Sequence, residues 1–377
     1  MAERKTKVLF LIHDLGHGGA EKVLVNLVNN MDPGRFDISV TALFGGGVNE
    51  QFLAPHIHFR SVFPRSFPGN SHIMKLFSPA LLHRLCVRKH YDIEVSYLEG
   101  PSARVVSGCR DEHTKRVAWI HCTMSSMKDV AASFRSEREA KACYRRFDRM
   151  AFVCGTVKEA FDRHCPLSVP ECVLYNTNES DRILACAKEE IENGIMRPQS
   201  FSWCGVGRLI PVKRFDRMLR IQKRLIAEGY PAHLYVLGDG PLRRELELWC
   251  ADNGVAEHVS FLGYRTNPYK YIAACDLFVC SSMSEGFSTA ATEALIVGTP
   301  VCTVEVSGMK EMLGENNEYG IVTENDEEAL YKAIKRLLDD PARLAHYREK
   351  AKERGRMFST ENTVRAVEEM LEQLVKS

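Results

Sequence analysis

The sequence lacks the features that mark membrane-spanning and secreted proteins. It contains no run of about eighteen apolar residues, so no segment is expected to cross a bilayer. No apolar leader follows the first residues, and the thirteen cysteines show no C-x-x-C spacing. Scattered, unpaired cysteines in a chain of this size are typical of a reducing compartment. We therefore expect a cytoplasmic protein.

Several motifs of metal and nucleophile chemistry are also missing. The chain has no D-x-D pair, no H-E-x-x-H and no Cys/His set at zinc spacing, so we expect neither a bound metal nor metal-dependent catalysis. It has no G-x-S-x-G motif, which argues against a serine nucleophile. Its 50 basic and 49 acidic residues give a net charge of +1, so no global field attracts nucleic acid.

What the sequence does contain is a regular alternation of short apolar runs and amphipathic stretches. The length of 377 residues indicates two domains. In the first half, residues 21–30 have the pattern of an amphipathic helix. The apolar runs of this half that predict buried strands are 7–12, 38–43, 93–98, 117–120, 150–153 and 172–174.

A second alternating series begins near residue 201, after a charged segment, 179–198, that we expect to link the domains. The predicted strands are 202–207, 233–238, 259–262, 276–280 and 300–303. The predicted helices are 215–228, 242–253, 267–274, 327–338 and 341–358, with another starting at 289. This order predicts two Rossmann-like, doubly wound α/β domains that face each other across a cleft, with ligands at the carboxyl ends of the strands.

The most informative feature is a pair of acids, Glu285 and Glu293, eight residues apart. Between them the sequence predicts a helix start, with Ser288 or Thr289 as its cap and Gly298 at its end. Amides of a first helical turn favour an anion, and carboxylates accept hydrogen bonds from hydroxyl groups. The segment therefore predicts a site for a sugar joined to a diphosphate, in preference to two unrelated surface acids.

Two cations occur in another predicted strand-to-helix loop. Arg208 and Lys213 stand five residues apart, after the strand at 202–207 and before the helix at 215–228. Arginine offers a planar fork of donors and lysine a mobile point charge, so the pair suits a diphosphate. The alternative is a pair of solvated surface cations.

Two glycine turns and an aromatic residue are weaker candidates. Gly238 begins a turn that either lines a nucleotide pocket or is needed only for the fold. Tyr264 follows a predicted strand and either lies beside a nucleotide base or packs against the rest of the protein. The loop with Gly18 and Gly19 is not G-x-G-x-x-G, which counts against a dinucleotide cofactor. Its backbone amides can instead approach a sugar or phosphate closely.

A single histidine, His121, ends a predicted strand of the first domain. It can donate to a hydroxyl group or lie near a developing cation, although a lone histidine is often structural. Its place at the carboxyl end of a strand favours a functional role.

Taken together, these motifs resemble the family 4 retaining glycosyltransferases of the GT-B fold. The pieces that carry the resemblance occur in the family's order over most of the chain, and the second half matches better than the first. They are Gly18–Glu21, His121, Gly207–Arg208 with Lys213, Gly238–Leu242, Phe261–Gly263, Glu285–Phe287 with Glu293, and Gly298–Val301.

The resemblance implies a role for each matching residue. Residues 1–180 would form the acceptor-side domain and 181–359 the donor domain, with a helix at about 360–377 packing back on the first. Glu285 and His121 would act at the donor sugar. The diphosphate would be bound by Arg208, Lys213, Ser288 and Thr289. The donor sugar would be bound by Glu285 with the amides of Gly286, Phe287 and Ser288. The nucleoside would be bound by Glu293, Gly238 and Tyr264.

The implied reaction transfers a sugar from a nucleotide-diphosphate sugar, with UDP expected ahead of GDP, to the hydroxyl of a glycan or lipid-linked glycan. It belongs to bacterial glycan or polysaccharide synthesis and needs no metal or other cofactor. Ser288, Thr289 and Thr292 suggest an unusually polar sugar pocket. Two alternatives remain, a GT-B-fold epimerase acting on a nucleotide sugar and a catalytically silent nucleotide-sugar binding protein.

One segment suggests contact with a membrane. Residues 73–89 combine apolar positions with lysine and arginine, in part as a basic amphipathic helix that can rest on anionic lipid. The alternative is a helix packed on the core with a solvated basic face.

Overall fold

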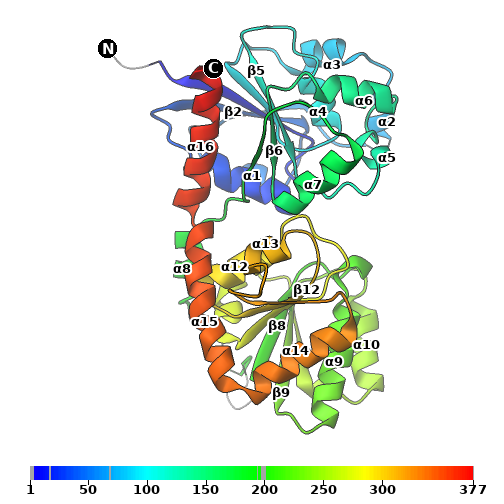
Figure 1. The fold of residues 1–377 in the computed structure, drawn as a ribbon, viewed down its shortest axis with the longest axis vertical. Coiled ribbons are helices and arrows are strands. Elements are labelled where there is room, and N and C mark those ends of the chain that lie inside the picture. The colour runs from blue at the N-terminus through cyan, green and yellow to red at the C-terminus, as the bar shows by residue number, and fades with distance from the viewer. Residues whose placement is uncertain (1–3, 17, 68, 193, 197–200, 377) are drawn as a thin grey trace. The chain divides into compact units, whose positions relative to one another are not determined.

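The computed structural model describes residues 4–16, 18–67, 69–192, 194–196 and 201–376. They divide into two compact units (Figure 1). Unit 1 consists of the described residues of Met1–Asn178 and Thr360–Ser377. Unit 2 consists of those of Glu179–Ser359.

The described residues of unit 1 form a seven-stranded sheet in the order β3-β2-β1-β4-β5-β6-β7, and every neighbouring pair is parallel. Its inner strands β1, β2 and β4 are buried along most of their length, as expected where helices cover both faces of a parallel sheet, although β2 and β4 include polar residues. The strands are β1 (Thr6–Ile12), β2 (Phe36–Phe44), β3 (His58–Phe63), β4 (Ile93–Ser96), β5 (Lys115–Ile120), β6 (Arg149–Phe152) and β7 (Glu171–Val173).

The helices of unit 1 include the last one in the chain, α16, which packs against α1 (Figure 1). Buried Glu368 of α16 accepts a hydrogen bond from the backbone amide of Asp32 at 2.6 Å and pairs with Arg35 at 2.7 Å. The helices are α1 (Gly19–Asn30), η1 (Glu50–Phe52), α2 (Asn70–Met74), α3 (Pro79–Cys86), α4 (Pro101–Val106), α5 (Met127–Val130), α6 (Glu137–Tyr144), α7 (Gly155–His164) and α16 (Thr360–Lys376).

The described residues of unit 2 form a second parallel sheet, in the order β10-β9-β8-β11-β12-β13. Numbered within the unit, this is the order 3-2-1-4-5-6 of a Rossmann fold. The strands are β8 (Phe201–Val206), β9 (Ala232–Leu237), β10 (Val259–Gly263), β11 (Leu277–Cys280), β12 (Val301–Val304) and β13 (Ile321–Thr323).

Helices of unit 2 connect these strands. They are α8 (Ser180–Cys186), η2 (Pro211–Lys213), α9 (Phe215–Ala227), α10 (Arg243–Asp252), η3 (Ala256–His258), α11 (Tyr269–Ala274), α12 (Thr289–Val297), α13 (Met309–Leu313), α14 (Glu327–Asp339), α15 (Pro341–Gly355) and η4 (Arg356–Phe358).

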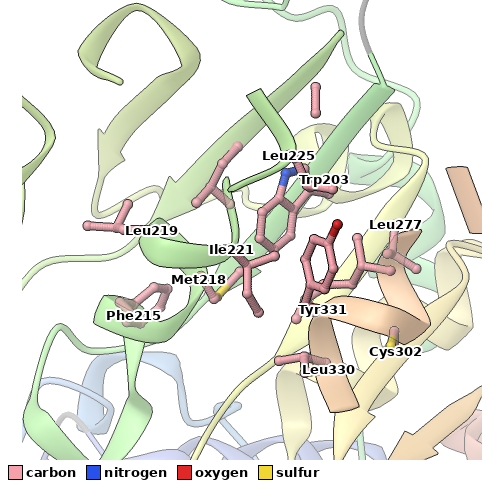
Figure 2. Packing of buried hydrophobic residues seen from close by; sticks show 14 of the residues in the cluster. Trp203, Phe215, Met218, Leu219, Ile221, Leu225, Leu277, Cys302, Leu330 and Tyr331 are labelled. Atoms are coloured by element: carbon pink, nitrogen blue, oxygen red, sulfur yellow. The ribbon is translucent and has the colours of Figure 1, made fainter. Parts of the chain in front are cut away.

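The core of unit 2 lies between its sheet and the helices α9 and α14. Figure 2 shows the indole of Trp203, from β8, among side chains of α9 and near Tyr331 of α14. The buried indole Nε1 donates a hydrogen bond to Gln222 Oε1 at 2.7 Å, and Gln222 in turn donates to the carbonyl of Ala232. This core therefore fixes β8, the strand that carries the Arg208 loop.

The prediction of two parallel-sheet, Rossmann-like domains is confirmed, although β3, β13 and α13 are among the elements that were missed. Strand β3 lies at the sheet edge and is only partly buried, so it lacks a continuous apolar run. Strand β13 and helix α13 are only three and five residues long. The predicted link at 179–198 is wrong in part, since Ser180–Cys186 is helix α8 of unit 2. Residues 193, 197 and 198 of that segment lie outside the described residues.

Candidate active site

The topology of unit 2 indicates which two loops are placed to bind a ligand. The strand order reverses between β8 and β11, and ligands of such sheets bind outside the carboxyl ends of the strands at that point. The loop after β8 carries Arg208 and Lys213, and the loop after β11 carries Glu285. The predicted cationic and acidic segments are therefore neighbours at the switch point.

Glu285 and Lys213 form an ion pair. The Lys213 Nζ donates to Glu285 Oε1 at 2.6 Å, and Ser282 Oγ donates to the same oxygen at 2.7 Å. The lysine side chain is 27% exposed and the glutamate side chain 11% exposed. A pair that keeps this much solvent contact can exchange one partner for a ligand, whereas a fully buried pair cannot do so cheaply.

Backbone contacts hold the two loops together. Met283 N donates to the carbonyl of Val212 at 2.8 Å, and Ser281 Oγ donates to the carbonyls of Lys213 and Arg214. Arg214 has a φ of 51°, in the left-handed region that side chains disfavour. The Ser281 hydroxyl therefore supports a strained turn directly beside Lys213.

Helix α12 places the second acid. Ser288 is its N-cap and accepts a hydrogen bond from Ala291 N, while Gly298 ends it with a φ of 79°, as the sequence predicts. Glu293 is 6% exposed and accepts a hydrogen bond from the Tyr269 hydroxyl at 3.3 Å. Glu293 thus lies inside the helix and Glu285 before it, in separate surroundings.

The polar residues of this segment are largely engaged in the helix itself. The Thr292 hydroxyl is buried and donates to the carbonyl of Ser288 at 2.8 Å, so it adds little polarity to a sugar pocket. Thr289 begins the helix and is half-buried. The buried Phe287 ring packs 5.8 Å from that of Phe358, so its side chain belongs to the packing of unit 2, next to half-buried Gly286.

The remaining predicted donor residues differ in their surroundings. Arg208 is exposed in the loop after β8. Gly238 has a φ of 129°, and a Cβ there would lie 2.0 Å from the Gly207 carbonyl oxygen. The turn at Gly238 is therefore glycine because it packs against the Arg208 loop, which favours the fold explanation. Tyr264 is 76% exposed, so its ring is not packed into the core.

Unit 1 has its own switch point, between β1 and β4, and His121 follows the next strand, β5. Its backbone N donates to Glu99 Oε2 at 2.9 Å, and its ring lies 4.7 Å from that of Tyr97. The residue is 7% exposed, and burial lowers its pKa to about 3, so the imidazole is neutral at pH 7. Among the described residues, no hydrogen-bond partner contacts its buried Nε2.

The glycine loop of unit 1 follows β1. Gly18 precedes α1, and a Cβ there would lie 1.9 Å from Glu21 Oε2, so the Glu21 carboxylate folds over this glycine. Burial raises the pKa of that carboxyl group. A Cβ on Gly19 would meet nothing within 4 Å, so space alone does not require glycine there. His17, the residue before Gly18, lies outside the described residues.

Four residues around these sites were not predicted. Ser281 and Ser282 directly follow β11, and Glu99 closely follows β4, so their positions at carboxyl strand ends were a usable signal. Tyr269 reaches Glu293 from α11, 24 residues earlier in the chain, and nothing local in the sequence indicates that contact.

Comparisons with known proteins agree with this architecture. The family model of the glycosyl transferases group 1 matches residues 195–354, within unit 2. A Campylobacter jejuni N-acetylgalactosamine-N,N'-diacetylbacillosaminyl-diphospho-undecaprenol 4-alpha-N-acetylgalactosaminyltransferase is 27% identical over 93% of this chain and 95% of its own. A Mycobacterium tuberculosis GDP-mannose-dependent alpha-(1-6)-phosphatidylinositol dimannoside mannosyltransferase is 27% identical over 60% of this chain and 57% of its own.

The solved structures give the same fold. Anabaena Alr3699/HepE in complex with UDP superposes with a TM-score of 0.77, at 20% identity, over 98% of this chain and 100% of its own. Together with the family match and the relatives, this supports a group 1 glycosyltransferase. The chain is a glycosyltransferase, a transferase of class EC 2.4, and neither the epimerase nor the silent binding protein receives support.

Proposed function

We propose that this glycosyltransferase belongs to family 4 and transfers a sugar, with retention of configuration, from a nucleotide-diphosphate sugar to an acceptor hydroxyl. The observation that carries the proposal is the Lys213–Glu285 ion pair at the switch point of unit 2. It joins the cation proposed for the diphosphate to the acid proposed for the sugar. A diphosphate and the sugar attached to it require that proximity.

The donor would bind along the two loops of unit 2. The diphosphate would take Lys213 from its ion pair and contact Arg208, whose exposed guanidinium is available. The amides at the start of α12, with Ser288 and Thr289, would contribute the positive end of the helix dipole. Released from Lys213, the Glu285 carboxylate would accept hydrogen bonds from sugar hydroxyls.

The nucleoside would lie along α12. Glu293 is proposed for the ribose hydroxyls, with the Tyr269 hydroxyl orienting its carboxylate. Tyr264 is proposed for the base, since its exposed ring offers a stacking surface. Gly238 contributes by shaping the Arg208 loop.

Bond changes in the transfer balance without a protein base. The bond between the anomeric carbon and the phosphate oxygen breaks, positive charge develops on the sugar ring, and the leaving phosphate gains negative charge. The acceptor oxygen bonds to the anomeric carbon, and its proton passes to the leaving phosphate. The cations and helix amides stabilise the leaving group, and removal of one such donor typically costs about 10²–10³ in rate.

From unit 1 we propose His121 as a hydrogen-bonding group for a sugar hydroxyl, and Gly18 and Gly19 as backbone donors. A neutral imidazole offers one donor and one acceptor, and a buried Nε2 without a partner among the described residues suits that role. A neutral ring also avoids repulsion by the positive charge that develops on the sugar.

The nucleotide is proposed to be UDP before GDP. The Anabaena structure contains UDP, whereas the mycobacterial relative is named for GDP-mannose, so both belong in a test. A screen of UDP-, GDP- and ADP-sugars for binding and donor hydrolysis would identify the donor. If no nucleotide sugar binds, the proposed function is wrong.

The proposed contacts of Arg208 and Lys213 with the diphosphate have their own test. With the identified nucleoside diphosphate, Arg208→Ala and Lys213→Ala should each weaken binding about 10- to 150-fold, because each removes a charge-assisted contact of about 1.5–3 kcal/mol. Lys332→Ala removes an exposed cation of α14 and should bind as the wild type does. Unchanged affinity in both loop variants would contradict diphosphate binding by Arg208 and Lys213.

The acceptor is proposed to be a glycan or lipid-linked glycan, reached at a membrane surface through residues 73–89. The Campylobacter relative is named for an undecaprenol-linked acceptor. Among the described residues, no helix has the length and apolar character needed to cross a bilayer. We propose a peripheral contact, on the inner face of the membrane.

The segment 73–89 has an exposed apolar surface. It is not one helix, because Ser78 caps α3 after a break that follows α2. Met74 and Leu82 are buried in unit 1, so part of the segment packs as the core-packed alternative requires. The apolar residues that remain exposed are Ile73, Leu76, Phe77, Leu81 and Leu85, with Arg84, Arg88 and Lys89 beside them.

This surface is firmly held. Buried Arg104 donates to the carbonyls of Met74 and Phe77, each at 2.7 Å, and pairs with Glu139. The exposed side chain of Leu76 therefore projects from a fixed segment. Exposed apolar residues beside cations fit the interface of an anionic bilayer.

Co-sedimentation with liposomes tests the contact. The wild type should bind vesicles that contain anionic lipid, and Leu76→Ser with Leu85→Ser should reduce the bound fraction several-fold. Leu248→Ser, on α10 of unit 2, is the matched control because Leu248 is as exposed as Leu85, at 55% against 52%. Sedimentation that does not depend on lipid would contradict the proposal.

A further inference from the structure

Unit 1 contains a mixed cluster of potential metal ligands that lies outside the proposed transfer site. His83 comes from α3, Glu94 from β4, and Cys109 follows α4. One imidazole nitrogen, one carboxylate oxygen and the thiol sulfur lie within 4.8 Å of one another. The three residues are 11 and 15 positions apart, so no zinc spacing is visible in the sequence.

The cluster is buried and already compact. Glu94 is 2% exposed and Cys109 1% exposed, while His83 is half-buried. The His83 Nε2 lies 2.8 Å and 3.0 Å from the two Glu94 carboxylate oxygens. A carboxylate removed from water in this way needs a positive partner, which a protonated imidazole or a cation can supply.

The geometry of these atoms suits a small cation. Zinc binds nitrogen and oxygen at about 2.0–2.2 Å and sulfur at about 2.3 Å, so two ligands about 3 Å apart can share it. The nitrogen and oxygen of His83 and Glu94 meet that condition. Cys109 completes the set after a small inward movement of its side chain.

The ligand types select the metal. A thiolate disfavours calcium and magnesium, which take oxygen ligands, and a mixed nitrogen, oxygen and sulfur set with tetrahedral geometry suits zinc. All three residues line a cavity of about 580 Å³, which also contains the ion pair of His90 and Asp111. Solvent in that cavity can provide the fourth ligand.

We propose that His83, Glu94 and Cys109 bind one zinc ion in unit 1. On binding, the Cys109 thiol and the imidazolium of His83 each lose a proton to solvent, and the thiolate, imidazole and carboxylate then bond to the ion. The site joins α3, β4 and the segment after α4, and its residues are distinct from Glu285 and His121. It stabilises unit 1 and has no step in sugar transfer.

Metal binding to the full-length protein tests the proposal. Metal-free protein titrated with Zn²⁺ in a calorimeter should bind one ion per chain. With Co²⁺ as the probe, the complex should show the near-ultraviolet charge-transfer absorption of a thiolate ligand. Wild-type protein that binds no stoichiometric metal, or that binds Co²⁺ without this absorption, would overturn the proposal before any variant is made.

Variants then identify the ligands. Cys109→Ser and His83→Gln should each lower Zn²⁺ affinity at least about 100-fold, since loss of even an outer-shell partner costs 10- to 100-fold. Cys109→Ser should also abolish the thiolate absorption. The controls are Cys122→Ser, an exposed thiol, and His90→Gln, a histidine of the same cavity, and both should bind like the wild type. Wild-type affinity in folded Cys109→Ser, with circular dichroism as the check, would exclude this ligand set.

Discussion

The Lys213–Glu285 ion pair joins two side chains for which we propose different roles, diphosphate binding for the lysine and sugar binding for the glutamate. Without a ligand, each side chain neutralises the other, and Ser282 holds the shared carboxylate oxygen. A donor would exchange this contact for two new ones, phosphate on lysine and sugar hydroxyls on glutamate. Because the pair is partly exposed, the exchange costs little desolvation.

Substitution of the two acids should separate their roles. If Glu293 binds the ribose, which does not change during transfer, Glu293→Gln should weaken the binding of donor and of free nucleoside diphosphate alike, by about 10- to 150-fold. If Glu285 lies near the cation that develops on the sugar, Glu285→Gln should leave nucleoside diphosphate affinity nearly unchanged and lower kcat at least about tenfold.

Calorimetry and steady-state kinetics on both variants check this assignment, with melting temperatures as the control for folding. If Glu285→Gln keeps its kcat while Glu293→Gln loses chemistry without a change in nucleotide affinity, the two roles are reversed.

Burial of His121 should make the stability of unit 1 depend on pH. Its pKa is about 3 in the folded chain, below the ordinary value of 6.5, so the unfolded state binds more protons between these values. Falling pH therefore costs native stability, by up to about 1.4 kcal/mol per pH unit from pH 6.5 toward pH 3.

His121→Gln removes this titration. Urea unfolding of the wild type and of His121→Gln between pH 7 and pH 4 should give unfolding free energies whose difference changes with pH. A difference that stays constant from pH 7 to pH 4 would contradict the burial of a neutral imidazole.

At the scale of elements, two loops of unit 2 depend on close backbone contact. A Cβ on Gly238 would clash with the Gly207 carbonyl oxygen, and a Cβ on Gly240 would likewise lie only 2.5 Å from the Leu209 carbonyl oxygen. Leu209 N also donates to the Asp239 carbonyl at 2.9 Å. The Arg208 loop is thus shaped by its neighbour along the sheet edge.

Gly238→Ala should therefore destabilise unit 2 by at least about 3 kcal/mol, from backbone strain and the clash with the Gly207 carbonyl. Gly254→Ala is the matched control, since Gly254 also has a positive φ, 69°, but has open space around its Cβ position. It should cost about 1–2 kcal/mol. Denaturant unfolding measures both, and equal losses would show that contact with Gly207 is unimportant.

Elements with strong local signals could be predicted from the sequence, and elements defined by their neighbours could not. Helix α12 has a serine cap and a terminal glycine, and both are where the pattern predicts them. Strand β3 has the sequence HFRSVF, whose charged and polar residues are tolerated because it lies at the edge of the sheet. That position is a property of the assembled sheet.

For the whole molecule, the same distinction applies to the site. The sequence indicated that Arg208, Lys213 and Glu285 are binding residues near the carboxyl ends of strands. The ion pair of Lys213 and Glu285 could not be predicted, because it depends on β8 and β11 being neighbours in the sheet. The proposed zinc ligands show the limit most clearly, since they come from α3, from β4 and from the segment that follows α4. Only the fold of unit 1 brings them together.

The chemistry of transfer and the zinc site in unit 1 should respond differently to a chelator. If cations and helix amides of the protein stabilise the leaving diphosphate, turnover with the identified donor should persist in excess EDTA. If zinc binds only the folded chain, its removal should lower the melting temperature. The same samples can therefore be assayed for both activity and unfolding. Loss of turnover that Mg²⁺ or Mn²⁺ restores would contradict metal-independent transfer, because those ions prefer oxygen ligands and would be acting at the diphosphate instead of at the Cys109 cluster.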